Sequence, residues 1–347
     1  MSILLTLLIL CIIVVLHEWG HFIVAKKSGV LVEEFAVGMG PKLFSVKKGE
    51  TMYSLRLIPI GGYCKMADEV EEGSQKLGFN QVALPKRIAI SFAGPFMNFV
   101  LALVLLIGIY SFVEVQTNTS EIGSVVKNKG AALAGIEAGD VINKIKINNE
   151  EHIIASFSDI QEVLDNENLQ LDTDTVTMKV GFTRNKHYLE KEVTAKYNNE
   201  TKSYVMGITA ATKQLTFAEA IRQGINQFIE YALLIFTTLG KLITDMTHTV
   251  SQLSGPVGIY TVTAQVTQTG SISTLLSLTA LLSTNIGMFN LLPIPGLDGS
   301  QVLFALVEKV IRREIPTRIK YALQMAGLIL VFGLMIFVTV NDIGKFF

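Results

Sequence analysis

Four long apolar stretches constrain this chain more than any other feature of its sequence. They cover Ser2–Val24, Ile88–Val113, Ile272–Ile294 and Ala322–Val340. Each is close to the roughly 20 residues that an α-helix needs to cross a bilayer. The chain as a whole is 50% hydrophobic and 17% charged, which is too apolar for a water-exposed globular surface of this size. The sequence therefore predicts a polytopic α-helical membrane protein with about four transmembrane helices.

A cleaved signal peptide is the alternative for the first stretch. Such a peptide begins with a basic segment and ends at a small-x-small cleavage site. Ser2–Val24 has neither feature. We therefore expect it to be a retained span.

Basic side chains cluster in two loops between these stretches. Positive charge is typical of the cytoplasmic side of short membrane loops. Both loops are therefore expected in the cytoplasm, with both termini and the polar segment after the second stretch outside. The basic residues are Lys26, Lys27, Lys42, Lys47, Lys48, Arg56, Lys65, Lys76, Lys86 and Arg87 in the first loop, and Lys309, Arg312, Arg313, Arg318 and Lys320 in the second.

The segment Phe217–Met246 is amphipathic rather than continuously apolar. Its uninterrupted apolar part, Tyr231–Gly240, is only about ten residues long, which is short for a span. A fifth crossing would also move the second basic loop outside. We expect amphipathic helices that lie against the membrane or against the other spans.

The segment between the second and third apolar stretches contains a polar region rich in Asn, Thr, Lys and Glu. Thr175–Val180 and Ser203–Ile208 alternate as strands do. We expect a soluble domain of roughly 95 residues here. The expected division is residues 1–114 with the first two transmembrane helices, 115–213 with the soluble domain, 214–271 with the amphipathic helices, and 272–347 with the last two transmembrane helices.

Charge and cysteine content exclude some classes of function. The net charge is −1, so no basic excess indicates a nucleic-acid partner. Cys11 lies in an apolar run and Cys64 in a polar loop. This pattern favours neither a disulfide framework nor a cysteine-rich metal site, and we expect two free thiols.

An H-E-x-x-H motif lies near the end of the first apolar stretch. On a helix, His17 and His21 share a face, so both imidazoles can bind one metal ion. The motif also arises by chance, but each ionisable group within a span costs about 2.5–3.5 kcal/mol and needs a partner. We expect the two histidines to bind Zn²⁺, and Glu18 to be the base that takes a proton from the attacking water.

A catalytic zinc ion needs a third protein ligand. Asp298 is the strongest candidate, because Pro293, Pro295, Gly296 and Gly299 break the third apolar stretch where this acid appears. In the expected topology the acid also lies at the same depth as the two histidines. The alternative is a helix cap or a turn acid in a cytoplasmic loop.

Five short segments combine into a specific pattern. They are HEWGH (17–21), GGYCKM (61–66), GPFMN (94–98), SGPVGI (254–259) and NLLPIPGLDG (290–299). Together they resemble the site-2 protease family of intramembrane zinc metalloproteases, in particular its bacterial RseP/RasP type. The resemblance extends over most of the chain.

The resemblance implies roles for individual residues. Zinc ligands would be His17, His21 and Asp298, and the catalytic base would be Glu18, which agrees with the assignment above. Substrate-binding residues would be Asn290, more distantly Asn285, and Gly61 and Gly62 in a membrane-associated β-hairpin around residues 51–66 that offers a free strand edge. One departure is Gly299-Ser300-Gln301, where many members have Gly-Gly-His; it follows the metal ligand and concerns only its surroundings.

The soluble region resembles a bacterial PDZ domain at Ile122–Val126 and at Gly135–Ile145, which implies an inserted domain of the α+β class. PDZ domains bind extended peptide ends at a sheet edge. A spacer, or a size filter that blocks uncut substrates by its bulk, is the alternative.

The resemblance implies a zinc metalloprotease of the bacterial inner (plasma) membrane that cuts peptide bonds in or near transmembrane segments. Its partners would be the lipid bilayer and single-pass membrane proteins already trimmed by another protease, such as anti-sigma factors or signal-peptide remnants. A metal transporter would also place His and Asp within the membrane, but it has no need of Glu18. A non-catalytic PDZ scaffold would have no need of an intact base either.

Overall fold

The computed structural model describes residues 2–71, 74–148, 150–165, 174–199, 203–245, 255–268 and 270–344 of the chain. The chain forms two compact units. The first unit comprises Met1–Ile109 and Glu219–Phe347, and the second comprises Tyr110–Ala218.

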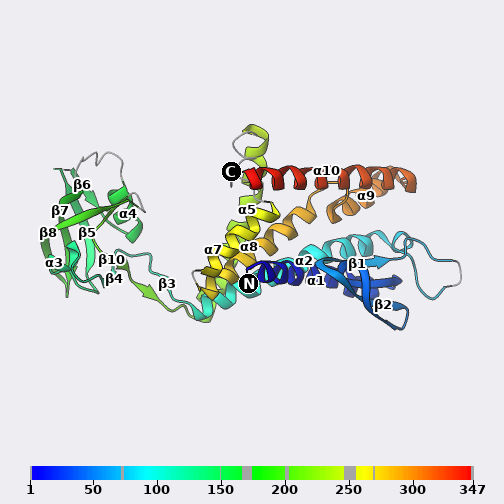
Figure 1. Ribbon diagram of the computed structural model, residues 1–347, viewed down its shortest axis with the longest axis horizontal. Helices are drawn as coiled ribbons and strands as arrows, with labels where there is room; N and C mark the ends of the chain where they lie inside the picture. Colours follow the sequence, from blue (N-terminus) through cyan, green and yellow to red (C-terminus); the bar gives the residue numbers. More distant parts are fainter. Residues whose placement is uncertain are drawn as a thin grey trace. The chain divides into compact units, whose positions relative to one another are not determined.

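Four helices of the described residues are long and apolar enough to cross a membrane. They are α1 (Ser2–Ser28), α2 (Leu84–Phe112), α8 (Ile272–Leu291) and α10 (Thr317–Gly344) (Figure 1). The four apolar helices expected from the sequence are thus confirmed. Helix α8 ends three residues before the predicted Ile294, because Pro293 and Pro295 have no backbone N–H to continue it.

Three further helices belong to the first unit: α5 (Phe217–Thr244), α7 (Pro256–Gln268) and α9 (Asp298–Ile311). Helix α5 is one continuous helix of 28 residues and is not among the four apolar helices. Met246, the last residue of the predicted amphipathic segment, lies outside the described residues. Helix α9 was not predicted; it follows α8 after a short break, and Glu308 near its end pairs with Lys320 at the start of α10.

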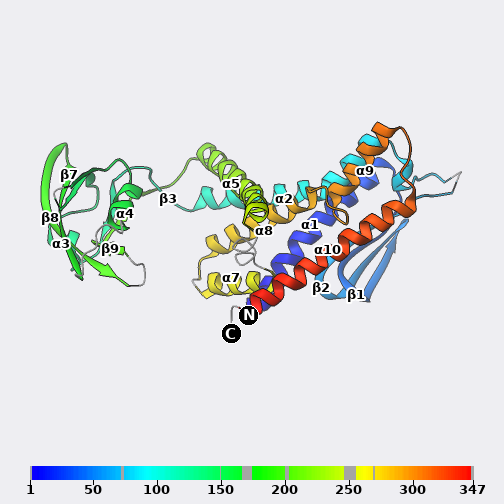
Figure 2. The ribbon, with the colours of Figure 1, turned by 90° about the horizontal axis from the view of Figure 1, so that it is seen from above.

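Strands β1 (Val32–Lys48) and β2 (Thr51–Met66) form an antiparallel hairpin that packs on α1 (Figure 2). Both strands bend back on themselves. Residues 34–37 pair with residues 52–55 on one side and with residues 62–65 on the other. Gly38, Gly40 and Gly61, all with positive φ, lie at these bends.

The pairing of these strands limits the free strand edge that was predicted around residues 51–66. Residues 52–55 are paired on both sides, since residues 34–37 and 44–47 flank them. Within the part of the chain that the structure describes, only residues 62–66 of β2 form an outer edge. The edge is therefore shorter than predicted.

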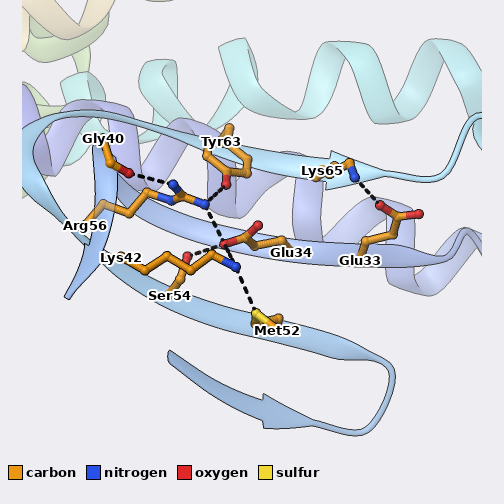
Figure 3. Close-up of polar contacts among 9 residues, drawn as sticks. All are labelled: Glu33, Glu34, Gly40, Lys42, Met52, Ser54, Arg56, Tyr63 and Lys65. Atoms are coloured by element: carbon orange, nitrogen blue, oxygen red, sulfur yellow. Dashed lines mark hydrogen bonds and ion pairs between the residues drawn. The ribbon is translucent and has the colours of Figure 1, made fainter. Parts of the chain in front are cut away.

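A polar cluster joins the segments of this hairpin (Figure 3). The carboxylate of Glu34 accepts hydrogen bonds from Ser54 Oγ at 2.6 Å and Arg56 Nη2 at 3.0 Å, and Lys42 Nζ lies 3.3 Å from it. Arg56 also donates to Tyr63 Oη and to the carbonyl oxygen of Gly40. Burial alone would raise the pKa of Glu34, but the hydrogen bonds from Ser54, Arg56, Tyr63 and Lys42 lower it to about 2.

A second buried charge cluster joins α2, α9 and α10. The carboxylate of Glu308 lies 2.8 Å from Arg87 Nη1 and 2.6 Å from Lys320 Nζ, and it accepts the backbone N–H of Ile315 at 3.0 Å. Burial would raise the pKa of Glu308, but these partners lower it below its usual range. The pairing holds the end of α9 against the beginnings of α2 and α10.

The second unit is built on a five-stranded sheet of order β6-β5-β7-β8-β9. Its strands are β5 (Val141–Ile147), β6 (Glu150–Ile153), β7 (Thr175–Arg184), β8 (His187–Asn198) and β9 (Ser203–Val205). Two separate two-stranded sheets complete the strands of this unit, one formed by β4 (Ile122–Val125) with β10 (Ile208–Ala210) and the other by β3 (Val115–Gln116) with β11 (Thr212–Lys213). The helices are α3 (Gly130–Leu133) and α4 (Phe157–Asp165).

The core of this unit lies under the central strands. Ile142, Ile145, Val180 and Phe182 are fully buried there. The strand predicted over Ser203–Ile208 is interrupted, because Gly207 has a positive φ of 83° and divides it into β9 and the start of β10.

Candidate metal centre

His17, His21 and Asp298 lie together inside the first unit. Among the described residues they are the one group of three His, Cys, Asp or Glu side chains whose ligand atoms all lie within 4.8 Å of one another. Asp298 Oδ2 is 3.0 Å from His17 Nε2 and 3.2 Å from His21 Nε2. The two Nε2 atoms are 3.2 Å apart, and both histidines are buried.

These distances fit a small cation held by three ligands. Zinc binds His nitrogen and carboxylate oxygen at about 2.0–2.2 Å, so two ligands of a tetrahedral ion lie about 3.3–3.5 Å apart. The observed spacings are only slightly shorter. Asp298 Oδ2 is buried and accepts no hydrogen bond from the described residues. A buried carboxylate oxygen without a donor is costly, and a cation between it and the imidazoles removes that cost.

Asp298 reaches the histidines because the chain breaks between α8 and α9. Gly296, with φ of 94°, turns the backbone, and Asp298 begins α9. Gly299 packs against the end of α8: a Cβ there would lie 2.3 Å from the carbonyl oxygen of Leu291. The break after α8, where Pro293 and Pro295 end the helix, thus lets the Asp298 side chain reach His17 and His21.

Helix α2 supplies the space and the orientation for the histidines. A Cβ at Gly94 would lie 2.3 Å from His21 Nε2 and 2.8 Å from His17 Nε2. On α1, a Cβ at Gly20 would lie 2.3 Å from the carbonyl oxygen of Ala93, so the two helices touch at this point. His21 Nδ1 lies 2.7 Å from the carbonyl oxygen of Ile90.

Asn98 is a site residue that the sequence analysis did not single out. It is fully buried on α2, and its side-chain nitrogen lies 3.2 Å from His17 Nδ1. In the sequence, Asn98 is the last residue of the GPFMN segment. Its signal was present all the same, since an amide in an apolar span needs a polar partner.

Glu18 lies next to His17 on α1 and is half-buried. A Cβ at Gly62 would lie 3.6 Å from Glu18 Cγ, so the edge segment of β2 passes this carboxylate. Cys64, whose backbone amide faces Glu18, belongs to the same segment. Burial and the nearby Glu18 raise the pKa of the Cys64 thiol to about 12.

The remaining predicted substrate-binding residues lie on two elements. Gly61 and Gly62 lie at the bend and edge of β2, as described above. Asn285 and Asn290 lie on α8 and are half-buried. Asn285 Oδ1 is buried and has no hydrogen-bond partner within the described ranges.

Four helices long and apolar enough to cross a membrane, together with a His-His-Asp group whose two histidines are buried and which lies beside a glutamate, are typical of a membrane metalloenzyme. Residues 5–334 match the family model of Peptidase family M50. The chain belongs to this family, and it is a zinc metalloprotease. The expectations of a site-2 protease relative with a zinc cofactor are thereby confirmed.

Two relatives cover nearly the whole chain. A Clostridium perfringens protein named "Putative zinc metalloprotease" is 37% identical over 344 residues, which are 99% of this chain and 98% of that protein. The zinc metalloprotease RasP of Shouchella clausii is 30% identical over 421 aligned positions, covering 98% of both chains. Neither the transporter nor the scaffold alternative has support in these relationships.

A solved PDZ domain of an SdrC-like protein from Listeria monocytogenes covers 28% of this chain and 93% of its own length. Its sequence identity to this chain is 18%, and the TM-score is 0.22.

Proposed function

We propose that this protease hydrolyses peptide bonds in or beside the bilayer, with zinc held by His17, His21 and Asp298. The observation that carries the proposal is the convergence of the three ligand atoms within 3.2 Å of one another. When bound, zinc acts as a Lewis acid that polarises the scissile carbonyl and makes water acidic enough to attack near neutral pH.

In this proposal Glu18 moves the protons. A carboxylate oxygen of Glu18 takes a proton from the attacking water and passes it to the leaving nitrogen. The half-buried position of Glu18 beside His17 supports this role.

The substrate has to be unwound before it is cut. A transmembrane helix satisfies its own backbone hydrogen bonds, which hides its peptide bonds. The edge at residues 62–66 passes Glu18, so we propose that it pairs with an extended substrate. Asn285 and Asn290 would hold the backbone from α8. The substrates proposed are pre-trimmed single-pass proteins, such as anti-sigma factors or signal-peptide remnants.

For the second unit we propose a PDZ domain that receives peptide ends. A cavity of about 330 Å³ lies between α4 and the β9–β10 segment, lined by Ile160, Leu164 and Tyr204 among others. Strand β9 is the last strand of its sheet, and an edge strand can be extended by a peptide. The size-filter role remains the alternative, and a peptide with an apolar end that binds this groove would favour recognition.

Replacing Glu18 by Gln tests the catalytic role. We expect the variant to keep zinc but to lose cleavage of a model membrane substrate by at least about 10²-fold, because the amide cannot carry the proton. Asp298→Asn should in contrast lower both zinc content and cleavage. Turnover at the wild-type rate in the purified Glu18 variant would remove this residue from the mechanism.

We further propose a multi-pass protein of the bacterial inner membrane with both termini and the PDZ domain outside. Reporters attached at Lys48, Asn198 and Arg313 should give signals inside, outside and inside. An outside signal at Arg313 would mean that α5 also crosses the membrane, and it would overturn this topology.

A further inference from the structure

Both histidines of the metal centre present their second ring nitrogen to α2. His21 Nδ1 lies 2.7 Å from the carbonyl oxygen of Ile90, which can only accept a hydrogen bond. His21 therefore carries its proton on Nδ1. Its Nε2 then has a free lone pair that faces Asp298.

His17 needs the same arrangement, because its Nε2 also faces Asp298 Oδ2. A neutral imidazole that binds a metal through Nε2 has its proton on Nδ1. The neighbour of His17 Nδ1 is Asn98 Nδ2 at 3.2 Å, and an amide nitrogen is a donor only. Two donors would then face each other, while Asn98 Oδ1 is buried with no partner in the described part of the chain.

Rotating the amide group of Asn98 by 180° resolves this conflict. The two ends of an amide have nearly the same shape, so the rotation moves no neighbouring atom. We propose that Asn98 is a positioning residue of the zinc site, whose side-chain carbonyl oxygen accepts the Nδ1–H of His17 and so directs Nε2 toward the metal. This inference rests on the proposed role of His17 as a zinc ligand.

Contacts on α8 hold Asn98 in place for this role. Ser283 Oγ donates to the backbone carbonyl oxygen of Asn98 at 2.8 Å. Gly287 is so close that a Cβ there would lie 3.2 Å from Asn98 Cβ. Asn98 is 0% exposed, so water cannot replace its oxygen as the acceptor. Helix α2 thus orients both ligands, His21 through a backbone carbonyl and His17 through one side chain.

Hydrogen-bond partners of ligating histidines typically contribute 10–100-fold to metal affinity. Asn98→Leu, which has a similar volume and no acceptor, should therefore raise the zinc dissociation constant about 10–100-fold. Asn98→Asp has an acceptor oxygen at both terminal positions of the side chain, so one of them faces His17 Nδ1 in either orientation. This variant should bind zinc at least as tightly as the wild type. The measurement is competition for zinc with a chelator on the purified full-length protein, and the spectrum of the cobalt-substituted protein reports the ligand geometry independently of cleavage.

Two controls separate this inference from the proposed function. Thr279→Val removes a buried hydroxyl of α8 that donates to the carbonyl oxygen of Leu275 on the same helix at 2.9 Å, and it should change zinc affinity less than about threefold. His17→Ala should lose zinc; if it does not, the proposed ligand set fails. If His17→Ala loses zinc but Asn98→Leu binds it as tightly as the wild type, only the positioning role is overturned. Should Asn98→Leu not fold, Asn98→Asp decides alone: a tenfold or greater loss of zinc affinity would mean that the amide donates rather than accepts.

Discussion

At the scale of single residues, the proposed metal centre requires a residue without a side chain at position 94. Gly94 faces both imidazoles, and a Cβ at this position would lie 2.3 Å from His21 Nε2. Contacts below about 3 Å between non-bonded heavy atoms are strongly repulsive, so any side chain here must displace a histidine. Gly94 lies on α2, yet it determines whether His17 and His21 on α1 can keep their positions.

Gly94→Ala should accordingly lose zinc and cleavage together, while the protein still inserts and folds. Zinc content by metal analysis and cleavage of a model substrate are the two measurements. Gly108→Ala is the matched control, because Gly108 lies on the same helix with no heavy atom within 4 Å of its would-be Cβ. A Gly94→Ala protein with full zinc occupancy would contradict the packing described for α1 and α2.

At the scale of elements, the bent hairpin is held by charge as well as by its ladder. Glu34 on β1 contacts Lys42, Ser54 and Arg56 directly. Arg56 in turn donates to Tyr63, so the cluster connects Glu34 with three other segments of the hairpin. The Glu34 side chain is 12% exposed, so its partners are poorly replaced by water. The cluster thereby helps to set the position of the edge at residues 62–66 relative to β1.

This cluster predicts a pH dependence of stability. The pKa of Glu34 is lowered from 4.5 to about 2 in the folded protein, so its stabilisation is present above pH 4.5 and is lost as the pH falls toward 2. Glu34→Gln should lower the free energy of unfolding at pH 7 by about 1–3 kcal/mol and flatten its change over this pH range. Unfolding in detergent, followed by circular dichroism, measures both quantities.

Glu33→Gln provides the comparison for that experiment. Glu33 is the neighbouring acid on β1, and its 2.7 Å pair with Lys65 is solvent-exposed, with side chains 41% and 62% exposed. Exposed pairs contribute about 0–1 kcal/mol, so this change should be nearly neutral. Equal effects of the two substitutions would show that the Glu34 cluster has no special role.

At the scale of the whole molecule, the chain separates its chemistry from its polar domain. The proposed metal-binding group lies in the first unit, and none of its three members comes from Tyr110–Ala218. The other two histidines among the described residues, His152 and His187, lie on β6 and β8 of the second unit and are not members of this group. The second unit begins and ends at adjacent points, because the N–H of Thr117 donates to the carbonyl oxygen of Ala211 at 2.8 Å.

Deletion of residues 118–210 should therefore leave zinc binding intact and change which substrates are accepted. The two ends can be joined without stretching the chain, since Thr117 and Ala211 are hydrogen-bonded. Zinc content and cleavage of a trimmed and an untrimmed model substrate are measured side by side. Loss of zinc in a folded deletion protein would show that the two units are not independent at the metal centre.

The sequence alone accounts for the features that depend on neighbouring residues. Apolar runs long enough to span a bilayer predict helices, because lipid cannot satisfy a free backbone. Histidines four residues apart share a helix face, whatever packs against it. The prolines after α8 end that helix by local sterics and by their missing N–H. Each of these properties is set within one segment of the chain.

Only the tertiary structure showed which residues of distant segments contact one another. It brings Asp298 to the histidines across some 280 residues of sequence, and it brings Gly94, Ile90 and Asn98 to them from α2. The double pairing of residues 34–37 and the interruption of the strand at Gly207 likewise follow from contacts between distant segments. Period and composition carry no information about which faces come together, because burial and close packing are properties of the assembled helices and strands.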